Sequence, residues 1–295
     1  MGETSPKAGP FEVQRTQEIM RVYRRFVRDR LGVISLGVVV AYVLCALFAP
    51  WLAPYDPFEI NPPESLQPPS KDHWLGNDEL GRDLASRLIY GARISLAFGV
   101  VTTAIAAVMG IILGVVAGYY GGAVDNLIMR LVDLLLAFPE ILLAIAVVSV
   151  LGPGTGNAMI AIGIHSVPMF SRTVRAQTLL IREQDYTQAA RSLGSPGWRI
   201  IWRHILPNAI APVIVLAALR IATAILAAST LSFLGLGVQK PTPEWGAILS
   251  SGRNHLRTAP HLMLYPGIAL SVVVIAFSSL GDAMRDALDP KLRGV

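Results

Sequence analysis

The sequence is poor in charged residues and in cysteine. Charged residues make up 15% of its 295 residues, whereas a soluble domain usually has about 25%. The single cysteine, Cys45, cannot form a disulfide within the chain. Hydrophobic residues instead reach 53%, and the mean hydropathy is +0.52. This balance excludes an ordinary soluble domain and favours a protein embedded in a membrane.

The motifs of common enzyme classes are also missing. The chain has no G-x-x-x-x-G-K-[ST] loop and no G-x-S-x-G or H-E-x-x-H arrangement, so neither ATP hydrolysis nor an intramembrane hydrolase is expected. His165 and His261 have no Cys, Asp or Glu spaced to complete a metal site. The net charge of +5 is spread beside apolar runs, which argues against a nucleic-acid partner. We predict a chain without catalytic residues, metal or cofactor.

Six apolar stretches are long enough to cross a bilayer, which takes about 20 residues. The first follows a polar segment, residues 1–30, without a small-residue cleavage site, so we expect a retained anchor. The sequence therefore predicts an all-α integral membrane protein with six transmembrane helices. The six stretches are residues 31–52, 94–119, 134–151, 158–180, 209–234 and 262–280.

The basic residues predict how these spans are oriented. With the N-terminus inside, cytoplasmic segments hold 17 of the 25 basic residues, external loops hold 7, and Arg220 lies within a span. Both termini and the connection 184–207 are then cytoplasmic. Within residues 1–30, the stretch 19–28 is either an amphipathic helix on the membrane or a simple basic flank.

The connection 184–207 has the pattern of two short helices. Tyr186, Ala189, Ala190 and Leu193 fall at i, i+3, i+4 and i+7, so they share one helical face. The two alanines would let another protein approach closely. Gly194 suits the residue that ends this helix. An amphipathic loop lying on the membrane surface is the alternative explanation.

The second short helix is predicted from the residues that follow. Ser195 is the expected N-cap and Pro196 lies in the first turn. Residues 198, 201, 202 and 205 would share an apolar face. Asn208 is then expected to cap the next span.

The residue order in this connection resembles the coupling loop of ABC importer permeases, which inserts into a cleft on the ATPase subunit. It reads Gln188-Ala189-Ala190 with Gly194 four residues on, followed by Ile-Leu-Pro at 205–207. Other blocks are similar to the C-type permease of dipeptide, oligopeptide and nickel importers. These blocks are residues 73–83, 90–96, 118–122, 129–133, 231–237 and 281–290.

The resemblance implies a type I ABC importer permease fold with a cytoplasmic coupling helix, in a bacterial cell membrane. Residues 31–93 would form the first span and an external loop, and residues 94–295 the permease core. The implied partners are a second, different permease, two cytoplasmic ATPase domains that bind ATP and Mg, and an extracytoplasmic solute-binding protein. The implied cargo is a dipeptide or oligopeptide, with nickel chelates or glutathione as alternatives. A secondary transporter or channel without an ATPase is the rival of another class.

The resemblance also assigns residues to ATPase coupling. The family commonly has Glu where this chain has Gln188, so a salt bridge to the ATPase from this position is not implied. Similarly, the carboxylate that often precedes the 231–237 block is replaced by Ala228. The assigned coupling residues are Tyr186, Gln188, Ala189, Ala190, Arg191, Leu193 and Gly194.

Four further predictions concern single side chains. Arg220 either lines the translocation path and meets a peptide carboxylate or pairs structurally with an acid such as Glu140. Trp245 is either an interfacial anchor or part of an external gate. Asp78 is expected to cap the helix leading to the second span. Arg130 and Asp133, spaced i and i+3, are expected to pair.

Overall fold

The structure, a computed structural model, describes residue 20 and residues 24–288. Of the predicted segment 1–30, only residue 20 and residues 24–30 are described, so its stretch 19–28 is described in part. Within the described part the chain is almost entirely helical, and the only extended pairing there is a bridge between Asn77 and Asp83. The predicted all-α class is confirmed.

The helices follow one another closely, apart from two longer connections at residues 53–83 and 234–244. A π-helical segment, Ile201–Ile205, joins α9 to α10. The α-helices are α2 (Arg30–Leu47), α3 (Ala49–Leu52), α4 (Leu84–Tyr120), α5 (Gly122–Leu136), α6 (Glu140–Leu151), α7 (Thr155–Arg182), α8 (Asp185–Ser192), α9 (Gly197–Ile200), α10 (Leu206–Phe233), α11 (Trp245–Gly252) and α12 (His261–Leu288).

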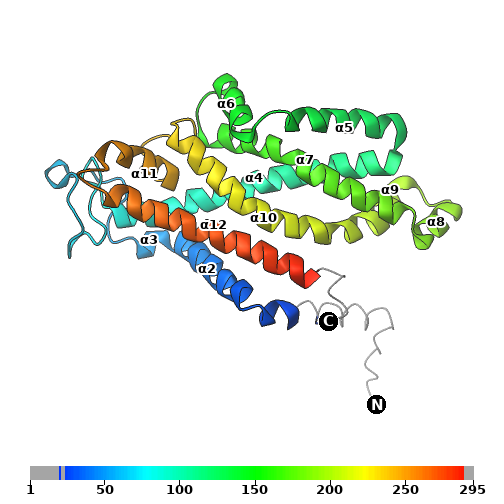
Figure 1. Ribbon diagram of the computed structural model, residues 1–295, viewed down its shortest axis with the longest axis horizontal. Coiled ribbons are helices and arrows are strands. Elements are labelled where there is room, and N and C mark those ends of the chain that lie inside the picture. Colours follow the sequence, from blue (N-terminus) through cyan, green and yellow to red (C-terminus); the bar gives the residue numbers. More distant parts are fainter. Residues whose placement is uncertain (1–19, 21–23, 289–295) are drawn as a thin grey trace, which may run out of the picture.

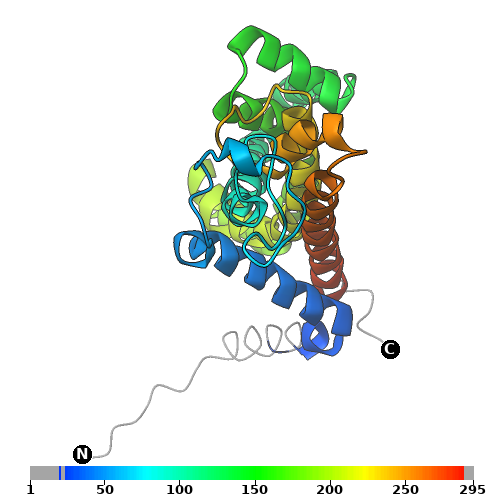
Figure 2. The same ribbon diagram turned by 90° about the vertical axis from the view of Figure 1, so that its left-hand side faces the viewer.

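The long helices form one elongated bundle. Figure 1 shows α2, α4, α7, α10 and α12 running along its length. The connection 53–83 and α11 gather at one end, which we call the loop end, and α8 and α9 lie at the other, the α8 end. Viewed from the loop end in Figure 2, α4 lies inside the bundle, with α2 on one side and the α5–α7 region on the other.

Four helices of the described part are long and apolar enough to cross a membrane. They are α2, α4, the continuous helix Gly197–Phe233 and α12. The pair α5 and α6 would make a fifth if it is one span. The remaining predicted stretch, 158–180, lies in α7, which has 28 residues and is therefore about 42 Å long. Each of the six predicted stretches thus falls on a helix or on the bent pair.

The third predicted stretch, 134–151, is not one straight helix. It begins at the end of α5 and continues into α6, and the two are bent by 94°. Pro139 precedes α6 with extended backbone angles. Proline has no N–H for the helical ladder and disfavours helical geometry in the residue before it, so the chain turns here.

Small residues let α4 and α7 pack closely. Gly110, Gly114 and Gly118 lie at intervals of one helical turn on α4 and face α7. A Cβ atom on Gly114 would lie 2.6 Å from the carbonyl oxygen of Ser171. Because lipid gives helices no hydrophobic reason to associate, such close backbone packing is a main source of helix pairing in membranes.

Helix α4 begins well before the predicted residue 94. Its N-cap is Asp83, whose carboxylate accepts a 2.7 Å hydrogen bond from the Ser86 backbone N–H. The prediction that Asp78 caps this helix is therefore wrong. Asp78 is instead held by two arginines, because its side chain lies within the folded connection at the loop end.

Candidate functional site

The α8 end carries the predicted coupling helix. Helix α8 ends at Ser192, and Gly194 follows with φ +77°. The Gly194 N–H donates to the Arg191 carbonyl at 2.9 Å, and the Ser195 N–H donates to the Ala190 carbonyl at 3.1 Å. These two bonds form a Schellman motif, so the predicted role of Gly194 in ending the helix is confirmed.

One face of α8 is not covered by the other described residues. Leu193 is 87% exposed and Tyr186 is 46% exposed, and Ala189 between them is also exposed. Thr187, on the other side, is buried. The predicted small and apolar face therefore points away from the described part of the molecule.

The inner side of α8 is fastened to the ends of α4 and α7. The Gln188 amide donates to the Arg182 carbonyl at 3.2 Å and to the Glu183 carboxylate at 3.3 Å. Arg182 in turn donates to the Gly118 and Tyr119 carbonyls at 3.1 and 3.2 Å. The Arg191 guanidinium lies 5.7 Å from the centre of the Tyr119 ring. The side chains of Gln188, Arg182 and Arg191 would therefore transmit a displacement of α8 to the ends of α4 and α7.

The second short helix departs from its prediction in two respects. Ser195 makes no cap, because Pro196 occupies the N-cap position of α9. Asn208 lies inside α10, where its amide donates to the His204 carbonyl at 2.6 Å instead of capping a helix start. The π-helical segment carries the chain into α10 ahead of Pro207, so the backbone is already helical where Asn208 was expected to start a new helix.

The π-helical segment also changes which residues share a face. Trp198 and Trp202 are 62% and 67% exposed, whereas Ile200 and Ile205 are fully buried. The prediction of a common face for residues 198, 201, 202 and 205 is therefore wrong, because Ile205 turns inward while both tryptophans turn outward.

Arg220 lies in the middle of α10 and is ion-paired with Glu140, the first residue of α6. Its Nε donates to Ser166 Oγ at 2.9 Å and its Nη1 to Thr223 Oγ1 at 3.1 Å. The pairing with Glu140 is one of the two arrangements predicted for this arginine. Whether Arg220 also lines a path stays a prediction.

Two more ion pairs join α5 to α7. Arg175 contacts Asp125 through two nitrogen–oxygen contacts of 2.5 Å. Arg172 contacts Asp133 at 2.6 Å. The predicted pair of Arg130 with Asp133 is wrong, because α7 brings Arg172 to this carboxylate from a neighbouring helix.

The loop end buries a network of charges. Arg82 contacts Asp78 at 2.7 Å, and Arg87 contacts the same carboxylate at 3.2 Å. All three side chains are at most 5% exposed. Arg87 also donates to the Pro57 carbonyl at 2.9 Å. The network holds the connection 53–83 against the start of α4.

His73 extends this network with a second pair of carboxylates. One ring nitrogen lies 2.9 Å from Asp83 and the other 3.1 Å from Glu64. Burial alone would lower the pKa of His73, but the hydrogen bonds and the charges of these two acids outweigh it and raise the pKa above its usual 6.5. The two carboxylates therefore favour the charged form of the imidazole.

Trp245 and Glu244 form the core of the loop end. Trp245 is 1% exposed, its ring packs edge-on against Tyr42 at 5.8 Å, and its Nε1 donates to the Leu88 carbonyl at 3.1 Å. An interfacial anchor must reach lipid headgroups, so that prediction is wrong. The gate stays a prediction, now for a side chain packed between α2 and α4.

Sequence reasoning missed Glu244 as a structural residue. Its side chain is fully buried and caps α11 by accepting from the Gly246 and Ala247 backbone N–H groups at 2.9 Å. It also accepts from Ser95 and Ser229, which belong to α4 and α10. An acid directly after Pro243, where a turn can lead into a helix, was the available signal. Its contacts with α4 and α10 involve residues distant in sequence, so no local pattern could predict them.

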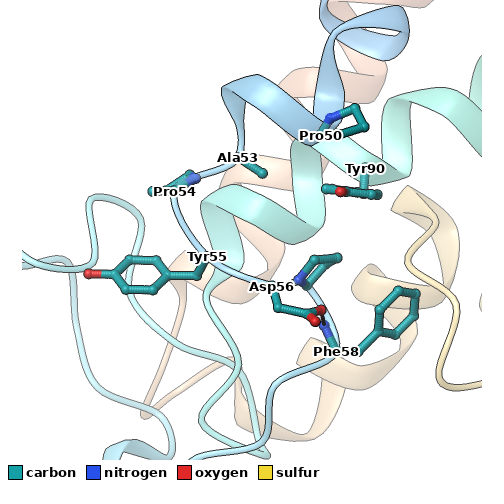
Figure 3. Close-up of a pocket in the computed structure, with 8 residues that line it drawn as sticks. Pro50, Ala53, Pro54, Tyr55, Asp56, Phe58 and Tyr90 are labelled. Atoms are coloured by element: carbon teal, nitrogen blue, oxygen red, sulfur yellow. Dashed lines mark hydrogen bonds between the residues drawn. The ribbon is translucent and has the colours of Figure 1, made fainter.

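A pocket of about 400 Å³ opens at the loop end beside α3. Figure 3 shows its lining from α3, the following connection and Tyr90 of α4. Its single carboxylate, on Asp56, accepts the Phe58 backbone N–H at 2.8 Å, so it serves the turn of the connection. In the described part of the chain, no three His, Cys, Asp or Glu side chains are grouped so as to hold a metal ion.

Comparison with known proteins assigns most of the chain to two family descriptions. Residues 110–294 match the binding-protein-dependent transport system inner membrane component. Residues 19–69 match the N-terminal transmembrane domain of oligopeptide transport permease C.

Curated relatives match along almost their whole length. A dipeptide transport system permease protein of Alkalihalophilus pseudofirmus is 46% identical over 271 residues, covering 92% of this chain and 89% of the relative. A glutathione transport system permease protein of Pectobacterium atrosepticum is 45% identical over 272 residues, covering 92% and 90%. The corresponding glutathione permease of Escherichia coli O6:K15:H31 is 48% identical over 273 residues, with the same coverage.

Solved structures support the fold. An inward-facing MetNI methionine ABC transporter chain aligns with a TM-score of 0.56 at 19% identity, covering 69% of this chain and 97% of that one. A chain of an amino acid ABC transporter aligns with a TM-score of 0.52 at 15% identity, covering 69% and 95%.

Proposed function

Because the chain belongs to the family of binding-protein-dependent transport system inner membrane components and is a permease subunit of an ABC importer, we propose that it carries dipeptides or short oligopeptides across the bacterial cell membrane. The name of the dipeptide permease relative supports this cargo. Glutathione is the alternative cargo that the names of two other relatives support, and nickel chelates are a further alternative.

The observation that carries the coupling role is the uncovered face of α8 on a firmly attached helix. Leu193 and Tyr186 offer apolar contact area, and Ala189 lets a partner backbone approach closely. Two cytoplasmic ATPase domains, which bind ATP and Mg, would dock here. Their closure on ATP would push α8, and the contacts of Gln188 and Arg191 would pass the movement to α4 and α7.

The remaining partners follow from the two other surfaces of the bundle. A second permease would cover the apolar outer side of α5 and α6, where Leu131 and Leu142 are 61% and 60% exposed, and would enclose a path beside Arg220. A solute-binding protein would deliver cargo to the loop end. In this proposal α8 and both chain termini lie in the cytoplasm.

A charge placed on the α8 face tests the docking role. We expect Ala189→Arg to abolish co-purification of the ATPase subunits and peptide uptake in the reconstituted importer, because a cation would be forced into an apolar contact. Ser192→Arg is the matched control, since it adds the same charge to an exposed position of the same helix outside the predicted face. It should retain most of the uptake.

Undiminished ATPase association and uptake in Ala189→Arg would contradict the docking role. The same preparation tests the rival mechanism. The chain reconstituted without ATPase subunits should move no peptide down an ion gradient, and movement there would establish a secondary transporter instead.

A further inference from the structure

The ion pair of Arg220 and Glu140 lies well inside the length of the helical bundle, where charged side chains are costly in a membrane. Arg220 is near the middle of the 28-residue helix α10, and Glu140 follows the bend between α5 and α6. Ionised side chains at membrane depth are costly unless they face the protein interior or a water-filled path. The pair must therefore be covered by a partner protein or by water.

The pair is also incompletely enclosed by the described part of the chain. The Glu140 side chain is 25% exposed and the Arg220 side chain 12% exposed. Thr223, which accepts a hydrogen bond from Arg220, is exposed. Glu140 of α6, Arg220 and Thr223 of α10, and Ser166 of α7 form a polar cluster that is partly open to the outside.

Hydrogen-bonding capacity remains unused beside the pair. His165 Nδ1 is buried without a hydrogen-bond partner in the described structure, and it lies 4.0 Å from the nearer Glu140 oxygen. Ser166 already accepts from Arg220 and donates to the Ile162 carbonyl. His165 is thus a second hydrogen-bonding group close to the Glu140 carboxylate.

We propose that Glu140 and Arg220 bind the zwitterionic backbone of the transported peptide, with Arg220 contacting its carboxylate and Glu140 contacting its ammonium group. This inference rests on the proposed function and names the chemical class that the path selects. A zwitterion brings one charge of each sign, so it replaces the contact between the two side chains with two new ion pairs. Neither side chain is then left as an unpaired charge at membrane depth, which would be strongly unfavourable.

The test compares free and blocked dialanine in the complete reconstituted importer. The substrates are dialanine, N-acetyl-dialanine without an ammonium group, and dialanine amide without a carboxylate. Each uptake rate is divided by that of dialanine in the same variant. Because all variants share one solute-binding protein, its own preference cancels when these ratios are compared between variant and wild type.

We expect Glu140→Gln to raise the relative uptake of N-acetyl-dialanine about tenfold, the factor that one charge-assisted hydrogen bond supplies. Arg220→Met should raise the relative uptake of dialanine amide by a similar factor. Asp133→Asn is the matched control, because it breaks a neighbouring ion pair with Arg172 and should change neither ratio. Equal losses for all three substrates would make the pair structural and overturn the inference while leaving the proposed function intact. A wild-type importer that moves no peptide would overturn both.

A second measurement keeps the pair intact in case these variants fail to assemble. In a Cys45→Ser background, Thr223→Cys places a thiol beside Arg220. Dialanine should slow the reaction of this thiol with an anionic reagent, and N-acetyl-dialanine amide should not. Equal labelling rates with both peptides would contradict binding at the pair.

Discussion

The two ends of the bundle differ in how they hold charged side chains. At the loop end, Asp78, Arg82 and Glu244 are at most 4% exposed and are fully engaged with neighbours in the same chain. At the α8 end, Leu193 and Trp202 are 87% and 67% exposed. Trp51 at the loop end is also 77% exposed, so the two ends differ in their buried charges and not in having exposed apolar side chains.

This difference indicates that the loop end is stabilised by contacts within the chain, whereas the α8 end needs a partner to complete its contacts. A buried charge is tolerated only when partners satisfy it, and the loop end supplies these partners from the connection 53–83 and from α4. Exposed apolar groups clustered at one place indicate an interaction surface. The loop end can therefore keep its shape before any partner binds, whereas the α8 end gains its full contacts only in the importer.

The largest expected effect comes from removing one buried charge at the loop end. Asp78→Asn would leave Arg82 and Arg87 without their shared carboxylate, and breaking such a buried pair costs about 3–5 kcal/mol. Hydrogen exchange should then become faster at the Leu66 and Leu84 amides, which donate to carbonyls of this region.

Lys240→Met is the control for this change. It removes a pair with Glu79 in which the lysine is 66% exposed, so we expect an effect below about 1 kcal/mol. Unchanged exchange in Asp78→Asn would show that the loop end does not depend on its charge network.

A smaller effect is expected from pH, and it should also be confined to the loop end. The pKa of His73 is raised in the folded protein because Asp83 and Glu64 stabilise its charged form. The contribution of charged His73 to folding stability is fully present below 6.5, the pKa in the unfolded chain. It is lost as pH rises through the higher pKa of the folded protein.

Amide protection around His73, corrected for intrinsic exchange, should therefore fall as pH rises above 6.5. The Ser70 amide, which donates to the His73 carbonyl at 2.8 Å, reports this change. His73→Gln should remove the pH dependence. Protection that increases with pH in the wild-type chain would contradict the assignment.

The smallest expected effect on stability is at the α8 end. Leu193→Ser should change the free energy of unfolding by no more than about 0.5 kcal/mol, because the side chain has few contacts to lose. It should nevertheless weaken ATPase binding. Leu47→Ser is the matched control, since Leu47 on α2 is 62% exposed and lies outside the proposed docking face. Equal ATPase binding by the two variants would remove Leu193 from the docking surface.

The features that were predictable from sequence depend on neighbouring residues. Gly194 ends α8 because the backbone there has φ +77°, a conformation that favours glycine. The apolar face of α8 follows from the spacing of its residues along the helix. The apolar stretches also locate the long helices, because each stretch is a run of consecutive residues. The pairing of Arg220 with Glu140 was predictable as an alternative, because a charge at membrane depth requires a partner.

The features that were missed depend on contacts between distant segments. Asp78 was predicted to cap a helix, but the fold of the connection 53–83 brings Arg87 into contact with its carboxylate. Asp133 had Arg130 nearby in sequence, but α7 supplied Arg172 instead. Trp245 has an ordinary interfacial sequence context, and only the packing of α2 and α4 shows that it is buried.

The central claim is that α8, and not the loop end, docks on the ATPase. In a Cys45→Ser background, Leu193→Cys and Lys71→Cys place single thiols at the two ends on exposed positions. We expect a short bifunctional reagent to cross-link residue 193 to an ATPase subunit in the assembled importer and to leave residue 71 unlinked to it. A cross-link from residue 71, or none from residue 193 in an importer that still transports peptide, would contradict the account.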